Sequence, residues 1–356
     1  MKTYRIAVVR GDGIGPEVIA SALEILDEVR RVGAGFGVEL IEAPAGAGTY
    51  LECGEALPAS TLAACRAADA ILLGACGLPD VRYPDGTEII PQVTLRIELD
   101  LYAGIRPAKR LEGVAGALAG DPAIDLVVVR ESTEGIFASL GGGIVLGDQL
   151  ATDTQVITRR GTERVVHSAF RRARRRGRAQ PRVTCVDKAN ILRSFAFFRK
   201  VFDEVAAQYP DVAADHLYVD AAAMELVRRP ERFDVLVTEN LLGDILSDLT
   251  AGLIGGLGVA PSADLGERHA VFQPCHGTAP DLAGMGVANP LAAILSVVMM
   301  LDHLADTHHD PAPAAAARRI ELAVTAALAS GEARTADLKG LATTRGATTA
   351  ILRAIG

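Results

Sequence analysis

Short apolar runs alternate with helix-length segments along this chain, and this alternation constrains the fold more than any other feature. Runs rich in Ile, Val, Leu and Ala lie at 6–9, 38–41 and 70–73, separated by segments of helical pattern at 18–31 and 59–68. The alternation resumes at 126–129, 183–186, 195–209, 217–219, 221–228 and 235–237. Such an order favours right-handed strand–helix–strand units. The sequence therefore predicts an α/β fold with a parallel-rich sheet flanked by helices.

The second half of the chain indicates how the fold is divided. The length of 356 residues allows one or two domains, and glycine-rich turns followed by alanine-rich helices begin at residue 254. We expect one lobe from 1–101 with 254–356, and a second from 102–253. Segment 136–158 is polar and glycine-rich at 141–143, and then alternates β-branched and polar residues. It is expected to form a strand arm that pairs with another subunit.

Composition excludes several classes of protein. A net charge of −8 gives no electrostatic basis for binding nucleic acid or an anionic membrane surface. Five widely spaced cysteines without a C-x-x-C pair predict neither a disulfide framework nor a thiolate zinc site, and they fit a cytoplasmic protein. The longest apolar run, 291–301, is too short for a membrane span and predicts a buried helix.

Two aspartates are candidates for a metal site. Asp244 and Asp248 are four residues apart in a helical pattern, so they lie on one face and border its apolar arc. A bound Mg²⁺ or Mn²⁺ would neutralise them, and Asp220, after a predicted strand, could add a third carboxylate. The alternative is an acidic helix edge in water.

Four cations stand at the edges of predicted elements. Arg96, Arg106 and Arg130 could together hold a polycarboxylate, since planar guanidinium groups bind carboxylates in pairs of hydrogen bonds. Lys188 follows a predicted strand and could transfer a proton if neighbouring cations lowered its pKa. Taken singly, each could equally be a surface cation. The glycine-rich turn at 11–15 fits either a nucleotide contact or a tight strand-to-helix turn.

Taken together, these motifs resemble those of the β-decarboxylating dehydrogenases, which include isopropylmalate, isocitrate, homoisocitrate and tartrate/D-malate dehydrogenases. The resemblance runs from residue 11 to residue 340. It rests on the motifs GDGIGPEV at 11–18, LR at 95–96, RP at 106–107, VRESTEG at 129–135, DKAN at 187–190, NLLGDILSD at 240–248 and HGTAPD at 276–281.

The resemblance implies a two-lobed fold of the isopropylmalate/isocitrate dehydrogenase kind rather than a Rossmann fold, and a homodimer whose active sites are shared. Lys188, Asn190 and Asp220 are then expected from the neighbouring subunit, and Asp220, Asp244 and Asp248 are expected to bind Mg²⁺ or Mn²⁺. Asp281 resembles the NAD-preferring pattern, since a carboxylate accepts hydrogen bonds from ribose hydroxyls and repels a 2′-phosphate. The residues expected to bind NAD are His276, Gly277, Thr278, Ala279, Pro280, Asp281, Leu282 and Asn289.

The reaction that the resemblance implies is the oxidative decarboxylation of a 3-substituted (R)-malate. Lys188, assisted by Asp220, is expected to take the proton of the C2 hydroxyl while hydride leaves C2 for the nicotinamide. Carbon dioxide is then lost from C3, and Arg96, Arg106 and Arg130 hold the carboxylates throughout. The 3-isopropylmalate type is expected first, with tartrate/D-malate or isocitrate-like types as alternatives.

Three departures from the family pattern bear on these expectations. Phe137 stands where a proton-donating Tyr is usual, and Gln273 stands where a Glu is common. Residues 89–94 match neither the isopropylmalate nor the isocitrate pattern. The substituent on C3 is therefore expected to contact Gln92, Val93 and Ile191. Because Phe137 cannot donate a proton, a non-catalytic protein that binds metal and polycarboxylate is the alternative from another class.

Overall fold

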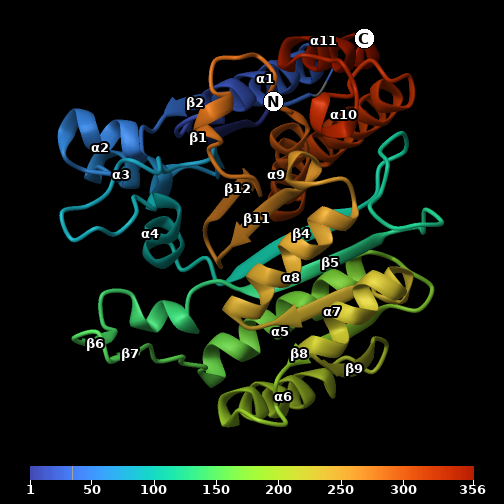
Figure 1. The fold of residues 1–356 in the computed structure, drawn as a ribbon. Helices are drawn as coiled ribbons and strands as arrows, with labels where there is room; N and C mark the ends of the chain where they lie inside the picture. Colours follow the sequence, from blue (N-terminus) through green and yellow to red (C-terminus); the bar gives the residue numbers. More distant parts are fainter. Residues whose placement is uncertain (34) are drawn as a thin grey trace.

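The structure is a computed structural model that describes residues 1–33 and 35–356. Within these residues it has twelve strands, eleven α-helices and five short 3-10 helices (Figure 1). The strands are β1 Thr3–Val9, β2 Gly37–Glu42, β3 Ala70–Leu73, β4 Ala103–Lys109, β5 Asp125–Glu131, β6 Ile144–Leu146, β7 Leu150–Thr152, β8 Arg182–Asp187, β9 Ala213–Tyr218, β10 Val235–Thr238, β11 Pro261–Leu265 and β12 Ala270–Pro274. The helices are α1 Gly15–Arg31, α2 Ala47–Cys53, α3 Ala59–Ala67, α4 Pro91–Glu98, α5 Arg159–Arg175, α6 Arg193–Ala206, α7 Val219–Arg228, α8 Asn240–Leu253, α9 Leu291–His308, α10 Pro311–Ala329 and α11 Thr344–Ile355. The 3-10 helices are Ile136–Ser139, Pro230–Arg232, Leu257–Val259, Pro280–Leu282 and Ala336–Leu338.

Ten strands form one sheet in the order β2-β1-β3-β12-β11-β4-β5-β10-β8-β9. Its two outer parts are parallel, as expected, whereas β11 pairs antiparallel with both β12 and β4, and β4 pairs antiparallel with β5. The predicted α/β class with a parallel-rich sheet is confirmed. The antiparallel centre was not predicted, because β11 and β12 are short runs in the stretch that the sequence marks only as glycine-rich turns.

The two faces of the central strands carry different side chains. Helices α8 and α5 cover opposite faces of these strands (Figure 1). In β4, Arg106 lines a cavity on the side of α8, whereas Ile105 and Pro107 line a second cavity on the side of α5. In β5, Arg130 lines the first cavity and Val127 the second. The period of two in a strand therefore delivers both arginines to one face of the sheet.

The glycine-rich turn at 11–15 is a close-packed turn. Gly11 and Gly13 have φ values of +75° and +59°, and a Cβ atom on Gly13 would lie 2.0 Å from the backbone oxygen of Thr278. The backbone N–H of Ile14 donates a hydrogen bond to the same Thr278 oxygen at 2.8 Å. Pro16 then starts α1 in its first turn. The turn supports the backbone of the loop predicted to bind NAD.

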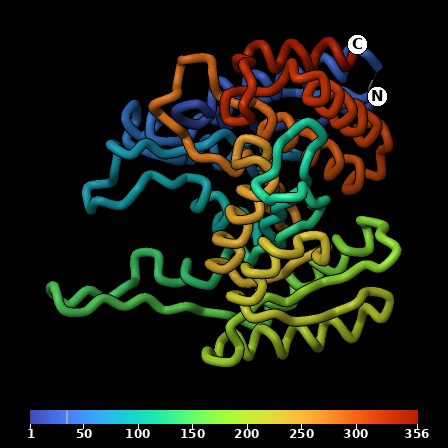
Figure 2. The backbone as a smooth tube through the Cα atoms, turned by 45° about the vertical axis from the view of Figure 1, so that its right-hand side comes forward, coloured from blue at the N-terminus to red at the C-terminus, as the bar shows by residue number. Residues whose placement is uncertain are grey.

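Strands β6 and β7 form a hairpin that extends away from the body of the protein (Figure 2). Its Ile144, Val145, Leu146 and Leu150 are all exposed, Val145 by 72%. A strand hairpin therefore lies within 136–158, and its pairing with another subunit stays a prediction. The turn of this hairpin is at residues 147–149, so its strands lie closer to the glycines at 141–143 than the alternating pattern at 153–158 indicates. Within 153–158 only Val156 forms a β-bridge, and its partner is Gly135.

Helix α9 passes a length and composition test for a membrane span, but 61% of it is buried in the fold, as predicted for a core helix. All five cysteines lie within residues 1–33 and 35–356 and are free thiols there.

Candidate active site

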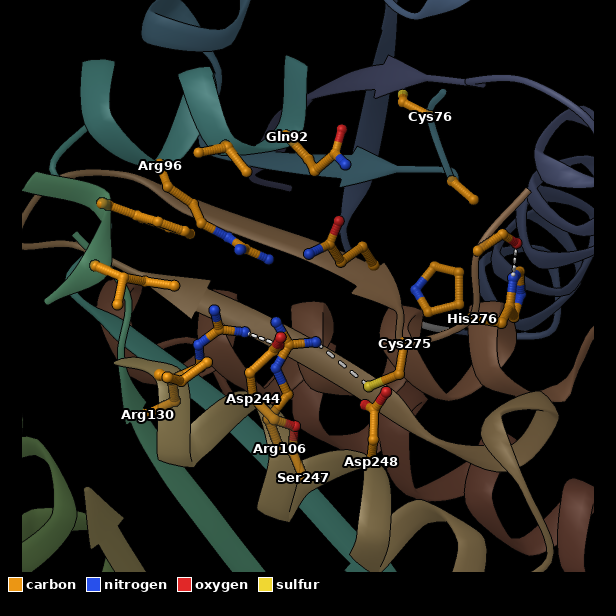
Figure 3. A pocket seen from close by; sticks show the side chains of 18 residues that line it. Cys76, Gln92, Arg96, Arg106, Arg130, Asp244, Ser247, Asp248, Cys275 and His276 are labelled. Atoms are coloured by element: carbon orange, nitrogen blue, oxygen red, sulfur yellow. Dashed lines mark hydrogen bonds and ion pairs between the residues drawn. The ribbon is translucent and has the colours of Figure 1, made fainter. Parts of the chain in front are cut away.

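A cavity of about 360 Å³ lies between α4, α8, the central strands and the loop after β12 (Figure 3). Its walls combine cations, carboxylates, amides and thiols. Of the predicted site residues it is lined by Gln92, Val93, Arg96, Arg106, Arg130, Asp244, Asp248, His276 and Gly277. The sequence therefore identified most of the polar wall of this cavity.

Arg130 is fixed at the end of β5. Its guanidinium pairs with Asp244 and donates to Asn240 Oδ1 at 2.6 Å, both on α8. Gly243 makes this approach possible, since a Cβ there would lie 2.6 Å from Arg130 Cγ. Burial lowers the pKa of Arg130 to about 10, with nearby Arg96 adding to the effect, so this cation favours an anionic partner in the cavity.

Arg96 and Arg106 share a partner that sequence reasoning missed. Asp264 on β11 is 1% exposed; its Oδ2 accepts from Arg96 Nε at 3.1 Å, and its Oδ1 lies 3.6 Å from Arg106 Nη2. Gln273 donates to Asp264 at 2.9 Å. Burial acts to raise the pKa of Asp264, but the arginines hold it below its usual range. The sequence does carry one signal for Asp264, which is the single acid in the short run that forms β11. A buried carboxylate needs a cation as its partner, so such an acid predicts a nearby arginine or lysine.

Asp244 and Asp248 project from α8 into the same cavity (Figure 3). The first turn of α8 is fixed by Glu239, whose carboxylate accepts from the backbone N–H groups of Leu241 and Leu242. Burial and the charge of Asp244 raise the pKa of Asp248, an environment that a bound cation would relieve. Two carboxylates with room for water and substrate oxygens fit Mg²⁺ or Mn²⁺.

The third predicted metal ligand is not close to these two within the chain. No set of three His, Cys, Asp or Glu side chains suited to a metal occurs among residues 1–33 and 35–356. Asp220, in the first turn of α7, instead accepts a hydrogen bond from Lys188 Nζ at 2.7 Å, and this bond lowers the pKa of Asp220. Lys188 and Asp220 do not line the cavity, and neither do Asn190 and Ile191. This separation agrees with the expectation that they serve a neighbouring subunit's site.

The wall expected to contact the substituent on C3 is mixed in polarity. Val93 is 9% exposed, and the Oε1 atom of Gln92 is buried without a hydrogen-bond partner among the described residues. Phe137 also lines the cavity, with its ring centre 6.0 Å from the Arg130 guanidinium carbon. Cys275 accepts a hydrogen bond from Arg106 Nη1 at 3.3 Å. Sequence reasoning did not select Cys275, because a thiol in that motif has no chemical signature of its own.

The loop after β12 carries most of the predicted NAD contacts. His276 faces the cavity, with its Nε2 atom buried and unpartnered in the described part of the chain, and burial lowers its pKa (Figure 3). Asp281 and Leu282 lie in an exposed 3-10 helix next to it. An imidazole nitrogen without a partner and a free carboxylate suit a nucleotide. Asn289 differs, because its side chain already bonds Asp337 and the backbone N–H of Leu291.

Comparisons with known proteins agree with this geometry. Residues 5–355 match the family described as isocitrate/isopropylmalate dehydrogenase. The chain belongs to this family. Among curated members, the 3-isopropylmalate dehydrogenase of Mycobacterium tuberculosis is 45% identical over 334 residues, covering 92% of this chain and 94% of that protein. The 3-isopropylmalate dehydrogenase of Aquifex aeolicus is 43% identical, covering 85% and 84%.

Solved structures of the family have the same fold. The isocitrate dehydrogenase of Methylococcus capsulatus has a TM-score of 0.87 and 39% identity, with 99% of each chain covered. The β-decarboxylating dehydrogenase of Thermococcus kodakarensis has a TM-score of 0.81 and 37% identity, with 99% of this chain and 96% of that chain covered. The predicted family and fold are confirmed, and family membership supports the prediction of a dehydrogenase.

Proposed function

We propose that this protein is a 3-isopropylmalate dehydrogenase that uses NAD and Mg²⁺ or Mn²⁺. The observation that carries the proposal is the meeting of three arginines and two aspartates in one cavity, in a chain whose curated relatives are named 3-isopropylmalate dehydrogenase. Arginines bind the carboxylates of a malate, and Asp244 and Asp248 would hold the divalent ion beside them.

The chain's own residues would divide the chemistry as follows. Arg96, Arg106 and Arg130 hold the two carboxylates, and Lys188 of a neighbouring subunit takes the proton of the C2 hydroxyl as hydride leaves C2. Lys188 Nζ donates to Asp220 Oδ1 in the single chain, so an Asp220 that serves as a metal ligand would have to release this hydrogen bond. When bound, the ion would supply Lewis acidity and NAD a hydride acceptor.

The assembly and division of the chain follow from the same proposal. A homodimer would cover the exposed hairpin and bring Lys188, Asn190 and Asp220 to the other subunit's cavity. Residues 1–101 and 254–356 would form the cofactor lobe and 102–253 the dimerisation and substrate lobe. The strand order supports this division, since it joins β1–β3 to β12 on one side of the sheet. Five free thiols fit a cytoplasmic location.

A second substrate type is supported by one observation. The unpartnered Oε1 of Gln92 would accept a hydrogen bond from a hydroxyl on C3, which tartrate has and isopropylmalate lacks. The ratio of the two activities therefore tests the substrate assignment within the family.

The test is a substrate panel of 3-isopropylmalate, D-malate, tartrate, isocitrate and homoisocitrate with Mg²⁺ and NAD, in which NADH and CO₂ are measured separately. We expect the highest kcat/KM with 3-isopropylmalate. A higher value with tartrate would replace the substrate assignment. Metal-dependent ligand binding without NADH from any substrate would establish the non-catalytic alternative.

A further inference from the structure

Asp264 changes the charge that the cavity offers to a ligand. Three arginines line the cavity, and two of them, Arg96 and Arg106, share the carboxylate of Asp264. Asp264 lies behind these arginines and does not line the cavity itself. The side chain is 1% exposed and its Oδ1 atom has no hydrogen-bond partner among the described residues. A carboxylate held in this way contributes its full charge without being available to bind a ligand.

The charges can be balanced against those of a substrate. A divalent ion bound by Asp244 and Asp248 cancels the two aspartates. The three arginines less Asp264 then leave two positive charges. Asp220 at the ion and a protonated Lys188, both from the neighbouring subunit, together add no net charge. Two positive charges match the two carboxylates of a dicarboxylate, whereas a tricarboxylate would leave one negative charge uncompensated in a partly buried site.

Two neighbouring residues, Gly104 and Gln273, accommodate the carboxylate of Asp264. Gly104 lies opposite Asp264 across the β4–β11 pairing, and a Cβ on Gly104 would approach Asp264 Oδ1 to 3.2 Å. Gln273 lines the cavity and donates its amide to Asp264. A Glu at that position would place two carboxylates in contact, so Asp264 and Gln273 form a matched pair with one charge between them.

We propose that Asp264 is a positioning residue that makes the site selective for dicarboxylates by removing one positive charge from the pair Arg96 and Arg106. The proposal rests on the proposed function only in that the cavity must bind substrate carboxylates. It predicts that the charge of residue 264, rather than the shape of the cavity, sets the preference between ligands that differ by one carboxylate.

The test measures binding rather than turnover. Glutarate and tricarballylate have the same three-carbon chain and differ by one carboxylate, and neither has a hydroxyl to oxidise. Isothermal titration calorimetry with Mg²⁺ gives the ratio of their Kd values for the full-length protein and for Asp264→Asn, which keeps the size and the acceptor atom of the side chain. We expect the wild type to bind tricarballylate no more tightly than glutarate. The Asp264→Asn variant should shift the ratio toward tricarballylate by about tenfold, the scale of one charge at several ångströms.

A second variant separates charge from structure. In Asp264→Asn/Gln273→Glu the carboxylate returns to the neighbouring position, so the wild-type ratio should return. Thermal unfolding and circular dichroism verify that each variant is folded. The inference is overturned if Asp264→Asn leaves the ratio within twofold of the wild type, or if the double variant keeps the ratio of Asp264→Asn. If the wild type binds neither ligand, the proposed carboxylate site itself is wrong.

Discussion

Lys188 Nζ lies 2.7 Å from Asp220 Oδ1, and this pair lies outside the cavity that contains Asp244, Asp248 and Arg106. The Lys188 side chain is 27% exposed and that of Asp220 is 69% exposed. The roles proposed for Lys188 as proton acceptor and for Asp220 as metal ligand require that another surface meets them. The arrangement therefore favours an active site completed across a symmetric dimer.

Mixed dimers test this sharing directly. Lys188→Met and Asp248→Asn should each abolish activity. When equal amounts are unfolded and refolded together, half of the dimers carry one variant subunit of each kind, and one of their two sites is intact. Activity should recover to about a quarter of the wild type in a two-fold symmetric dimer. No recovery, with dimers confirmed by sedimentation, would place both residues in a site within one subunit.

Phe137 predicts a defect in the second half of the reaction. The ring lines the cavity beside Arg130 but has no proton to give to the carbon that loses CO₂. We expect Phe137→Tyr to raise the rate of CO₂ release at least tenfold while NADH formation changes little, the scale of positioned acid catalysis. Separate measurement of NADH and CO₂ under single-turnover conditions provides the comparison. Equal yields of both products in the wild type would show that another group or water already donates that proton.

The choice of nucleotide should depend on Asp281. This carboxylate is exposed in the 3-10 helix Pro280–Leu282, and it is expected to accept from ribose hydroxyls and repel a 2′-phosphate. Asp281→Lys should lower kcat/KM with NAD by roughly tenfold and improve NADP use, because the hydrogen-bond acceptor is lost and a cation replaces it. Glu55→Lys makes the same charge change at an exposed position away from the cavity and serves as the control. Unchanged NAD use in Asp281→Lys would remove this residue from the cofactor site.

His303 predicts a loss of stability in acid. Burial, with Arg172 and Arg175 nearby, lowers its pKa from 6.5 to about 4. Between these values the unfolded chain binds the proton and the folded protein does not. The stability that this histidine contributes is therefore fully present well above pH 6.5 and falls as the pH is lowered toward 4, by roughly 2 kcal/mol between pH 7.5 and pH 5.

Urea unfolding at pH 7.5 and pH 5 measures this loss. His303→Gln, which cannot gain the charge, should have a smaller dependence on pH than the wild type. His309→Asn, at an exposed position with φ of +52°, should retain the wild-type dependence. An identical pH dependence in wild type and His303→Gln would show that His303 is not the group responsible.

Much of the cavity was predictable because its chemistry follows from local patterns. Asp244 and Asp248 share a helix face by their spacing alone, and Arg130 ends an apolar strand where ligands bind in α/β proteins. Asp264 was not predictable in this way. Its partners, Arg96 and Arg106, lie far away in sequence and meet it only because β11 enters the sheet antiparallel beside β4. No local pattern specifies that pairing.

The strand order also has a consequence for how the chain is made. Strands β1–β3 leave the ribosome first, but their neighbour β12 and the helices α9 and α11 that pack on α1 belong to the last ninety or so residues. At about 5–20 residues per second, the amino-terminal strands wait on the order of ten seconds or more for these partners. The middle of the chain contains β5, β8, β9 and β10 with α5–α8, so it can assemble during synthesis. We therefore expect a chaperone to bind the first quarter of the nascent chain rather than its middle.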